Sequence, residues 1–155
     1  KPLNLKPIGE NLDTLLTKFK NKMGNPDIVI ELGRYIVGEA GYYVSKVIDR
    51  KISRNHVYLI ANGGLHHHLA ASGNFGQVIR KNYPVVIGNK FDSNEKELAS
   101  VVGPLCTPLD LLANKMELPK ASIDDLIVVL QSGAYGFSAS PASFLSHPAA
   151  QEVLV

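Results

Sequence analysis

Cys106 is the only cysteine of the chain, and its thiol is the first candidate for catalysis. It lies within residues 102–110, where a Gly-Pro pair follows an apolar run and predicts the end of a strand. Pro108 restricts Thr107 to an extended or turn geometry, so Cys106 is expected on a constrained turn. Loops on a rigid scaffold often display reactive groups, whereas a lone intracellular cysteine is more often a small buried hydrophobe.

Glu31 and Arg34 form a second candidate site, because a carboxylate and a guanidinium follow the short apolar run 27–30. At the carboxyl end of a strand in a (β/α)8 barrel, such side chains lie on the face that carries active sites. The structural alternative is a surface salt bridge across a turn, which would contribute little stability.

Three adjacent histidines, His66, His67 and His68, follow a Gly-Gly turn and suggest a zinc site. Consecutive residues do not share a face of a helix or strand, so at most two of them could bind one ion. No carboxylate or thiol stands at typical ligand spacing nearby. We therefore expect hydrogen-bonded or substrate-facing histidines and no metal.

Two elements are expected to position Glu31 and Arg34. Apolar residues at the i, i+3, i+4, i+7 spacing predict an amphipathic helix over residues 11–23, and Gly24 marks its end. The apolar run that follows predicts a strand at 27–31. A helix followed by a fully apolar strand is typical of one αβ step of a parallel sheet, and one such step cannot close a barrel.

The hydrophobic period changes to two after Gly41, which predicts β-structure. Residues 43–49 and 56–61 flank a polar turn and predict a β-hairpin. Further strands are predicted at residues 84–88, 97–102, 116–118, 126–130 and 152–155. Their short spacing is typical of a β-sandwich or barrel, so the fold class is mainly β.

Composition restricts the classes of function. With 45% hydrophobic and 19% charged residues and a net charge of +2, the chain suits a globular domain and suggests neither nucleic acid nor an anionic membrane as partner. A single cysteine excludes an internal disulfide framework and suits a reducing, cytoplasmic compartment. No apolar run approaches the ~20 residues that span a bilayer. Lys1 is not a natural start, so we expect the true N-terminus to be missing.

Four segments, in order along the chain, carry a family resemblance. They are Glu-Leu-Gly-Arg-Tyr at 31–35 with Val-Gly-Glu-Ala-Gly at 37–41, Asn-Gly-Gly-Leu at 62–65, Gly-Pro-Leu-Cys-Thr-Pro-Leu-Asp at 103–110, and Ser-Gly-Ala-Tyr-Gly-Phe-Ser at 132–138. Together they resemble the C-terminal half of the fold-type III pyridoxal-phosphate decarboxylases, which include the diaminopimelate, ornithine and arginine decarboxylases. Leu32 replaces the family's proline in the first segment.

The resemblance implies a fold and a cofactor, pyridoxal 5'-phosphate. Residues 1–38 would form the end of the (β/α)8 cofactor-binding barrel, and residues 39–155 the C-terminal β-barrel domain of an alanine racemase-like enzyme. The family's counterpart of Glu31 faces the pyridine nitrogen and keeps the ring protonated. The counterpart of Arg34 contacts the cofactor phosphate, with Gly33 and Tyr135 nearby. A core tyrosine beside a glycine turn is the alternative for Tyr135.

The resemblance also implies a mechanism and a homodimer. In the family the counterpart of Cys106 reaches the active site of the partner subunit and supplies a proton to the α-carbon after decarboxylation. Asp110 is expected to act as a turn-stabilising acceptor and not as a catalyst. The cofactor lysine and the glycine-rich phosphate loop belong to the barrel half, and no residue here matches them. We therefore expect no activity from this chain alone.

Departures from the family pattern bear on the substrate. Ala70 and Asn74 stand where the diaminopimelate branch has the arginine and tyrosine that hold the far end of its substrate. Asn62 and Thr107 stand where the ornithine branch has acids. Because a charged far end would be left unpaired, the substrate is expected to have a masked or neutral far end.

The histidine run and the cysteine segment most resemble decarboxylases that act on an aminoacyl group tethered to a carrier protein, and decarboxylase-like proteins of exopolysaccharide and exosortase loci. His66, His67, His68 and Thr107 would then contact the substrate. Arg80 and Lys81 are candidates for meeting an acidic acyl carrier.

Three alternatives remain open. A non-catalytic relative could keep the fold for a regulatory or binding role, although the presence of Glu31, Arg34, Cys106 and Tyr135 argues against it. An amino-acid racemase has the same fold, but the cysteine and glycine-tyrosine segments favour the decarboxylases. A free-standing β-barrel binding module with a histidine metal site is the third.

Overall fold

The computed structural model describes residues 3–24 and 26–155, which divide into two compact units at the boundary between Glu31 and Leu32. The first unit contains helix α1 (Lys6–Met23). It extends the predicted helix of residues 11–23 toward the N-terminus, because Pro7 suits the first turn of a helix, where its missing N–H costs no hydrogen bond. Gly24, with a φ of 71°, ends the helix as expected.

The strand predicted at residues 27–31 is not formed. Residues 26–32 belong to no helix or strand, although they include the apolar run from which the strand was predicted. A parallel strand needs a hydrogen-bonded neighbour, and every strand of the described sheet comes from the second unit. The prediction of this strand was therefore wrong for the described chain, because local sequence cannot supply the partner strand.

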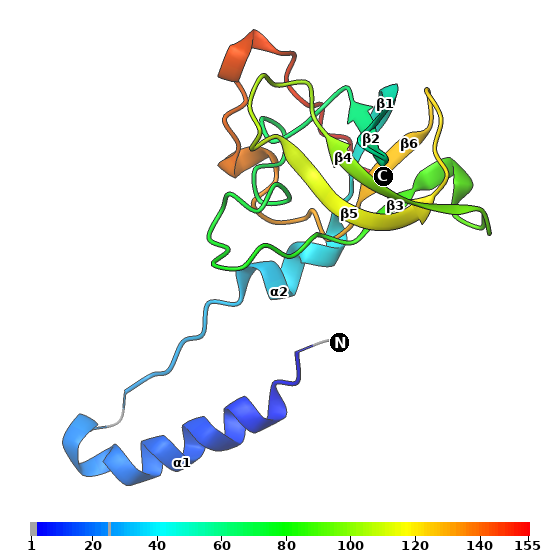
Figure 1. The fold of residues 1–155 in the computed structure, drawn as a ribbon. Coiled ribbons are helices and arrows are strands. Elements are labelled where there is room, and N and C mark those ends of the chain that lie inside the picture. Colours follow the sequence, from blue (N-terminus) through cyan, green and yellow to red (C-terminus); the bar gives the residue numbers. More distant parts are fainter. Residues whose placement is uncertain (1–2, 25) are drawn as a thin grey trace. The chain divides into compact units, whose positions relative to one another are not determined.

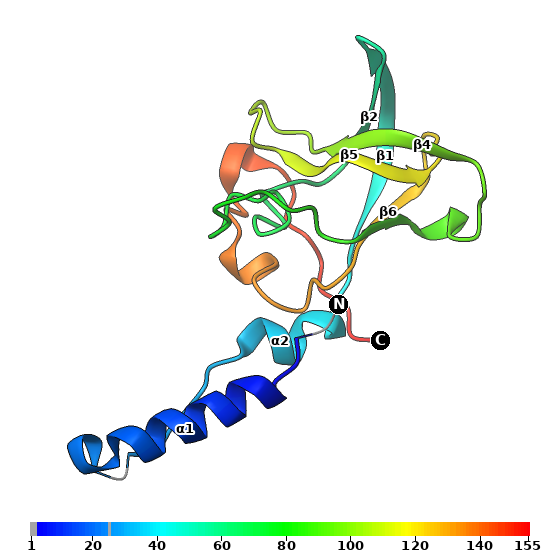
Figure 2. The ribbon, with the colours of Figure 1, turned by 60° about the horizontal axis from the view of Figure 1, so that its bottom comes forward.

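The second unit is built on one six-stranded sheet with the strand order β3-β6-β1-β2-β4-β5 (Figures 1 and 2). Its strands are β1 (Tyr43–Ser53), β2 (His56–Ala61), β3 (Val85–Ile87), β4 (Lys96–Val102), β5 (Leu111–Pro119) and β6 (Leu126–Val129). All neighbours are antiparallel except β2 and β4. The edge strands β3 and β5 also contact each other, so the sheet curls toward a barrel, and the predicted mainly β fold is confirmed.

The core lies inside this curled sheet. Buried residues alternate with more exposed ones in β1, β2, β3 and β6, whereas β4 and β5 bury consecutive residues beside their irregular pairing. The largest fully buried side chains include Leu59, Ile87, Leu112 and Ile127. Each buried side chain of this size contributes roughly 1.5–3 kcal/mol by leaving water. The core therefore fixes the register of the strands that carry the candidate site.

The β1–β2 hairpin is tighter than the sequence predicts. Strand β1 continues to Ser53, and only Arg54 and Asn55 form the turn, both in the left-handed region at φ of 51° and 61°. Two-residue turns of this hand match the twist of the flanking strands.

Most of the other predicted strands are observed. Those at residues 84–88, 97–102 and 126–130 correspond to β3, β4 and β6, and residues 116–118 are part of the longer β5. The strand predicted at 152–155 is absent, because residues 149–155 pair with no neighbour and the side chain of Leu154 is fully exposed. No helix within residues 3–24 and 26–155 is both long and apolar enough to cross a membrane.

Candidate functional site

Arg34 and Tyr135 meet in the folded domain although they are 101 positions apart in the sequence. Arg34 lies on the short helix α2 (Gly33–Val37), and its guanidinium carbon is 5.1 Å from the centroid of the Tyr135 ring. A Cβ on Gly33 would lie 3.4 Å from the Tyr135 hydroxyl. No carboxylate of residues 32–155 forms an ion pair with Arg34. Gly33, Arg34 and Tyr135 thus form one cluster with an uncompensated positive charge.

Backbone contacts between two glycine-containing segments bring this cluster together. The amide of Gly133 donates to the carbonyl of Gly38 at 3.0 Å, and the amide of Ser132 donates to the carbonyl of Gly41 at 2.8 Å. A Cβ on Gly133 would collide with the carbonyl of Val37, and one on Gly41 would lie 2.7 Å from the Gly133 Cα. Both positions therefore require glycine for the close approach of the two backbones.

Tyr135 has a left-handed backbone, with a φ of 56°. A large non-glycine residue in this region carries strain, and such residues concentrate at functional sites. Tyr135 is 42% exposed, and its ring also contacts Phe75, with the two centroids 5.5 Å apart. The alternative of a core tyrosine is therefore excluded.

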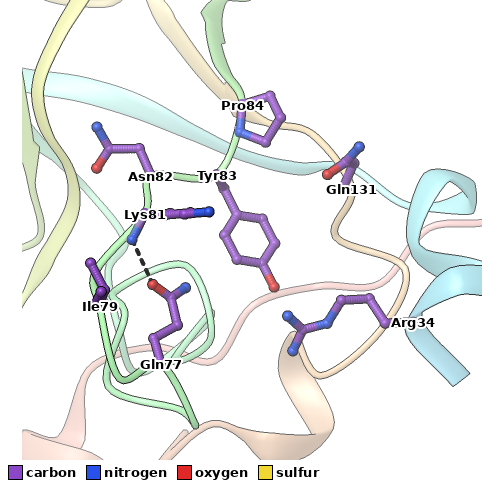
Figure 3. A pocket seen from close by; sticks show the side chains of 8 residues that line it. All are labelled: Arg34, Gln77, Ile79, Lys81, Asn82, Tyr83, Pro84 and Gln131. Carbon is purple, nitrogen blue, oxygen red and sulfur yellow. Dashed lines mark hydrogen bonds between the residues drawn. The ribbon is translucent and has the colours of Figure 1, made fainter. Parts of the chain in front are cut away.

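A pocket of about 280 Å³ opens beside Arg34 (Figure 3). Two cations, Arg34 and Lys81, line it together with amide side chains, and none of its lining residues is acidic. The full lining is Arg34, Gln77, Ile79, Lys81, Asn82, Tyr83, Pro84 and Gln131. The charge and polarity of this pocket favour an anionic ligand.

His67 joins three separate segments. Its Nε2 lies 2.7 Å from the carbonyl oxygen of Pro148, which can only accept, so Nε2 carries the proton. Its Nδ1 then accepts from the Tyr43 hydroxyl at 3.0 Å. Burial raises the pKa of Tyr43, with the nearby Asp110 adding to the effect, so the hydroxyl stays protonated as this arrangement requires. His67 is half-buried and keeps some exposed surface.

His68 connects the histidine turn to the Ser132 loop. Its Nδ1 accepts from the amide of Ala71 at 3.3 Å, and its Nε2 donates to Ser132 Oγ at 2.9 Å. The Ser132 hydroxyl in turn donates to the carbonyl of Val129 at 2.8 Å. Burial, with the charge of Arg34 adding to it, lowers the pKa of His68 to about 4. His68 is therefore neutral at physiological pH.

His66 is fully buried, and neither of its ring nitrogens has a hydrogen-bond partner among the described residues. Its ring packs against that of His67 at a tilt of 48°, with centroids 3.9 Å apart, and lies 5.3 Å from the ring of His147. Burial, then the neighbouring imidazoles, lower its pKa to about 4. Within residues 3–24 and 26–155, no group of three or more His, Cys, Asp or Glu side chains is placed to hold a metal ion.

Three predicted substrate contacts thus divide in the structure. His66 and His68 point into the domain, whereas His67 remains partly accessible. His68 has the hydrogen-bonded role that was one of the two expected for these histidines, and contact of any of the three with a substrate stays a prediction. Sequence inspection could not reveal which of the three are buried, since three identical residues show no hydrophobic pattern.

Cys106 lies on a turn just after β4, and its side chain is exposed. The predicted turn is confirmed, and the alternative of a buried hydrophobic cysteine is excluded. Thr107 beside it is half-buried, and its Oγ1 accepts from the amide of Leu109 at 3.3 Å. This hydrogen bond holds the turn in the compact form that Pro108 favours.

The Asp110 carboxylate fixes the cysteine turn to the histidine turn. It is 3% exposed and accepts hydrogen bonds from the amide of Leu105 at 2.9 Å and from that of Leu65 at 2.6 Å. A Cβ on Gly64 or on Gly103 would collide with this carboxylate. The prediction of Asp110 as a turn-stabilising acceptor is confirmed, and the two glycines are explained by its packing.

Arg80 has a structural role that the sequence did not suggest. Its guanidinium donates to the carbonyls of Ser72 and Leu111, so it is not free to meet a partner. Lys81, in contrast, is exposed and lines the pocket. Asn74 donates to the carbonyls of Ser72 and Leu109 at 3.3 Å and 3.1 Å, so its amide supports the loop. Of the two predicted rim cations, only Lys81 remains available.

Glu31 ends the first unit and is exposed. Sequence reasoning missed Tyr83, which contacts Arg34, and Tyr43 and His147, which contact the histidine turn, because each contact joins distant segments. The only local signal at Tyr83 is a following proline before a strand.

The family model for the "Pyridoxal-dependent decarboxylase, C-terminal sheet domain" matches residues 34–133. The chain therefore belongs to the pyridoxal-dependent decarboxylase family, which also confirms the resemblance in its sequence segments.

Two curated relatives illustrate the match. An L-glutamyl-[BtrI acyl-carrier protein] decarboxylase of Niallia circulans is 46% identical over 129 residues, covering 81% of this chain and 30% of that enzyme. A 2-[(L-alanin-3-ylcarbamoyl)methyl]-2-hydroxybutanedioate decarboxylase of Staphylococcus aureus is 33% identical, covering 88% of this chain and 36% of that enzyme. The chain thus spans about a third of the length of these relatives.

A solved structure confirms the fold. The diaminopimelate decarboxylase from Methanocaldococcus jannaschii superimposes with a TM-score of 0.74 at 25% identity, covering 89% of this chain and 30% of that one.

The residues present fit the phosphate of a pyridoxal cofactor. Arg34 has no carboxylate partner within residues 32–155, the pocket beside it has no acidic lining, and the glycine contacts bring Tyr135 against it. When bound, the pyridoxal ring supplies an electron sink for reactions at the α-carbon of an amino acid.

Proposed function

We propose that this chain contributes the C-terminal part of a pyridoxal-phosphate-dependent amino-acid decarboxylase whose active site is shared across a homodimer. The observation that supports it most is the cluster of Gly33, Arg34 and Tyr135, which leaves one guanidinium uncompensated beside a pocket without acids. Family membership supplies the reaction class.

Each residue has a proposed role. Arg34 and Tyr135 bind the cofactor phosphate through charge-assisted hydrogen bonds, and Gly33 allows the backbone to approach it. Glu31 would face the pyridine nitrogen of the cofactor and keep it protonated. Cys106 of one subunit donates its Sγ proton to the α-carbon that has lost its carboxylate in the partner's site.

The substrate is proposed to be an amino acid with a masked far end, bound to an acyl carrier protein. The 46% identical relative acts on a glutamyl group of an acyl-carrier protein, by its name. The S. aureus relative, by its name, acts on a compound whose L-alanyl group is joined through a carbamoyl group to a 2-hydroxybutanedioate, so its side-chain nitrogen is acylated although its far end carries carboxylates. His67 and Thr107, which keep exposed surface, are the proposed substrate contacts of this chain, supported from within by His66 and His68.

Steady-state turnover would test this proposal with the protein expressed from its complete coding sequence. L-Glutamate, L-lysine, L-ornithine and diaminopimelate would be compared with glutamate loaded on an acyl carrier protein. We expect kcat/KM to be highest by at least tenfold for the carrier-loaded substrate. Efficient turnover of free lysine or ornithine would contradict the assigned substrate class, and no carbon dioxide release from any substrate would contradict the proposed enzyme.

The cofactor lysine and the phosphate loop are proposed to lie outside residues 1–155, since no segment here resembles either. A polypeptide of these residues should then give no visible absorption band for a covalently held cofactor after pyridoxal phosphate is added. A stable band that survives dialysis would contradict this part of the proposal.

A further inference from the structure

Tyr83 carries a polar group that the described contacts leave unexplained. It lies two residues before β3 and is only 8% exposed. Its hydroxyl is buried and has no hydrogen-bond partner among the described residues. A buried hydroxyl without a partner costs about 1–3 kcal/mol, so this position is expected to serve a group that binds there.

The Tyr83 hydroxyl lies at the wall of the pocket, on the side of Arg34. Tyr83 lines the pocket of about 280 Å³, and Figure 3 shows its hydroxyl pointing toward the side where Arg34 enters. Lys81 and Gln131 line the same pocket. Donor groups of four kinds, a guanidinium, an ammonium, a phenol and an amide, therefore surround one space that no carboxylate lines.

The Tyr83 ring also holds Arg34 in place. The Arg34 guanidinium carbon is 5.9 Å from the centroid of the Tyr83 ring and 5.1 Å from that of Tyr135, so the cation lies near the faces of two tyrosines. The edge of the Tyr83 ring packs against His68, with centroids 5.3 Å apart. Because His68 is neutral, it supports the ring without repelling the guanidinium.

We propose that Tyr83 is a positioning residue of a phosphate-binding pocket: its ring orients Arg34, and its hydroxyl donates a hydrogen bond to the bound phosphate monoester, with Lys81 as a second cation. The pocket is rich in donors and free of acceptors that carry charge, which suits a dianion with several lone pairs. This inference rests on the proposed function, because a pyridoxal cofactor would be the source of the phosphate monoester.

Comparing the affinities for three ligands distinguishes a hydroxyl that binds phosphate from one that only stabilises the fold. Dissociation constants for pyridoxal phosphate, pyridoxal and inorganic phosphate would be measured by absorbance titration and calorimetry on the protein expressed from its complete coding sequence. The variants are Tyr83→Phe, which removes only the hydroxyl, and Tyr83→Leu, which also removes the ring. Tyr58→Phe is the matched control, because Tyr58 is a half-buried tyrosine on β2 that does not line this pocket.

We expect Tyr83→Phe to weaken the binding of pyridoxal phosphate and of inorganic phosphate about tenfold, because one hydrogen bond to a charged group is lost. The affinity for pyridoxal should not change. Tyr83→Leu should weaken the binding of both phosphate ligands by roughly another threefold, because the cation–π contact with Arg34 is also lost. That additional loss should vanish in an Arg34→Gln background, since the ring acts through Arg34.

Two results would overturn the proposal. One is wild-type affinity of Tyr83→Phe for both phosphates, and the other is an equal loss for pyridoxal and pyridoxal phosphate, which would assign the hydroxyl to the fold. If inorganic phosphate binds in a Tyr83-dependent way while pyridoxal phosphate does not bind at all, the pocket stands and the proposed cofactor role falls. Tyr58→Phe should match wild type for all three ligands.

Discussion

Asp110 shows how a single buried carboxylate can organise the turn that carries Cys106. Its two oxygens accept from amides of Leu65 and Leu105, which belong to turns on different parts of the sheet. Glycines at positions 64 and 103 leave room for the carboxylate. The orientation of the exposed Cys106 thiol therefore depends on a buried neighbour four residues away in the sequence.

Replacing Asp110 by alanine should lower the free energy of unfolding by about 2–4 kcal/mol, because two buried amides lose their acceptor. Asp110→Asn keeps one carbonyl acceptor and should cost less. Urea denaturation would measure both changes. Asp92→Ala, at an exposed aspartate, serves as the control and should change stability by no more than about 0.5 kcal/mol. An equally small effect at Asp110 would contradict the role given to it.

Cys106→Ala should lower kcat by roughly 10²–10⁴ with carrier-loaded substrate, the usual contribution of a positioned proton donor. Stability should remain near that of the wild type, since the side chain is exposed. Cys106→Ser retains a donor of higher pKa and should lose less activity. Steady-state kinetics with thermal unfolding as a parallel measurement would check this, and an unchanged kcat in the alanine variant would remove Cys106 from the mechanism.

At the scale of elements, the site depends on how the Ser132–Tyr135 loop meets the segment that follows α2. Backbone atoms of Gly41 and Gly133 approach so closely that neither residue can carry a Cβ without a shift. This backbone contact brings the Tyr135 loop beside α2, where the Tyr135 ring lies over Arg34.

Gly133→Ala should therefore lower the unfolding free energy by about 1–3 kcal/mol and weaken cofactor binding, because overpacking moves the loop away from Val37. Gly38→Ala is the matched control: its Cβ would meet only Arg34 Cγ at 3.6 Å, an ordinary contact. Denaturant unfolding and a cofactor titration would measure the two effects. Equal behaviour of both variants would show that the glycine contact is not limiting.

The buried histidines make stability depend on pH. The pKa values of His66 and His68 are lowered to about 4, whereas unfolded histidine titrates near 6.5. Between these values the unfolded chain binds more protons, so the unfolding free energy falls as pH is lowered from 6.5 to 4, by roughly 3 kcal/mol for each imidazole. Urea titrations across this range would measure the slope. His66→Leu should flatten it, and an unchanged slope in that variant would exclude His66 as a source.

Features of the fold that depend on neighbouring residues could be predicted from the sequence, and most features that depend on contacts between distant residues could not. Periodicity and turn residues predicted β1 through β6 because these signals are local, and the quoted motifs predicted the meeting of Arg34 and Tyr135. The predictions of strands at 27–31 and 152–155 were wrong, because a strand needs a hydrogen-bonded partner that local sequence does not reveal. The burial of His66 and the unpartnered hydroxyl of Tyr83 depend on long-range packing, which no spacing rule could reveal.

At the scale of the whole molecule, the proposed homodimer predicts that two inactive variants with substitutions at different residues restore activity when their subunits are mixed. A dimer with one Cys106→Ala subunit and one Arg34→Gln subunit should contain one site with both intact residues, since each site takes its cysteine from the partner. Equal mixing with subunit exchange should restore about a quarter of wild-type activity, because half of the dimers are mixed and each has one working site.

Activity assays on the mixture, against each variant mixed only with itself, would check this prediction. A mixture no more active than its components, with exchange verified by mass spectrometry, would place both residues in the same subunit's site and contradict the shared arrangement.

The hydrogen bond from Leu65 to Asp110 spans 45 positions of the chain. Closing a loop of that length costs entropy that a short turn does not, so the surroundings of the thiol cannot be completed until this distant contact has formed. During synthesis, the glycine turn at 63–64 emerges first and must wait for the aspartate. Protection of the Leu65 amide from hydrogen exchange during refolding should therefore report the late assembly of the barrel and not the formation of a local hairpin.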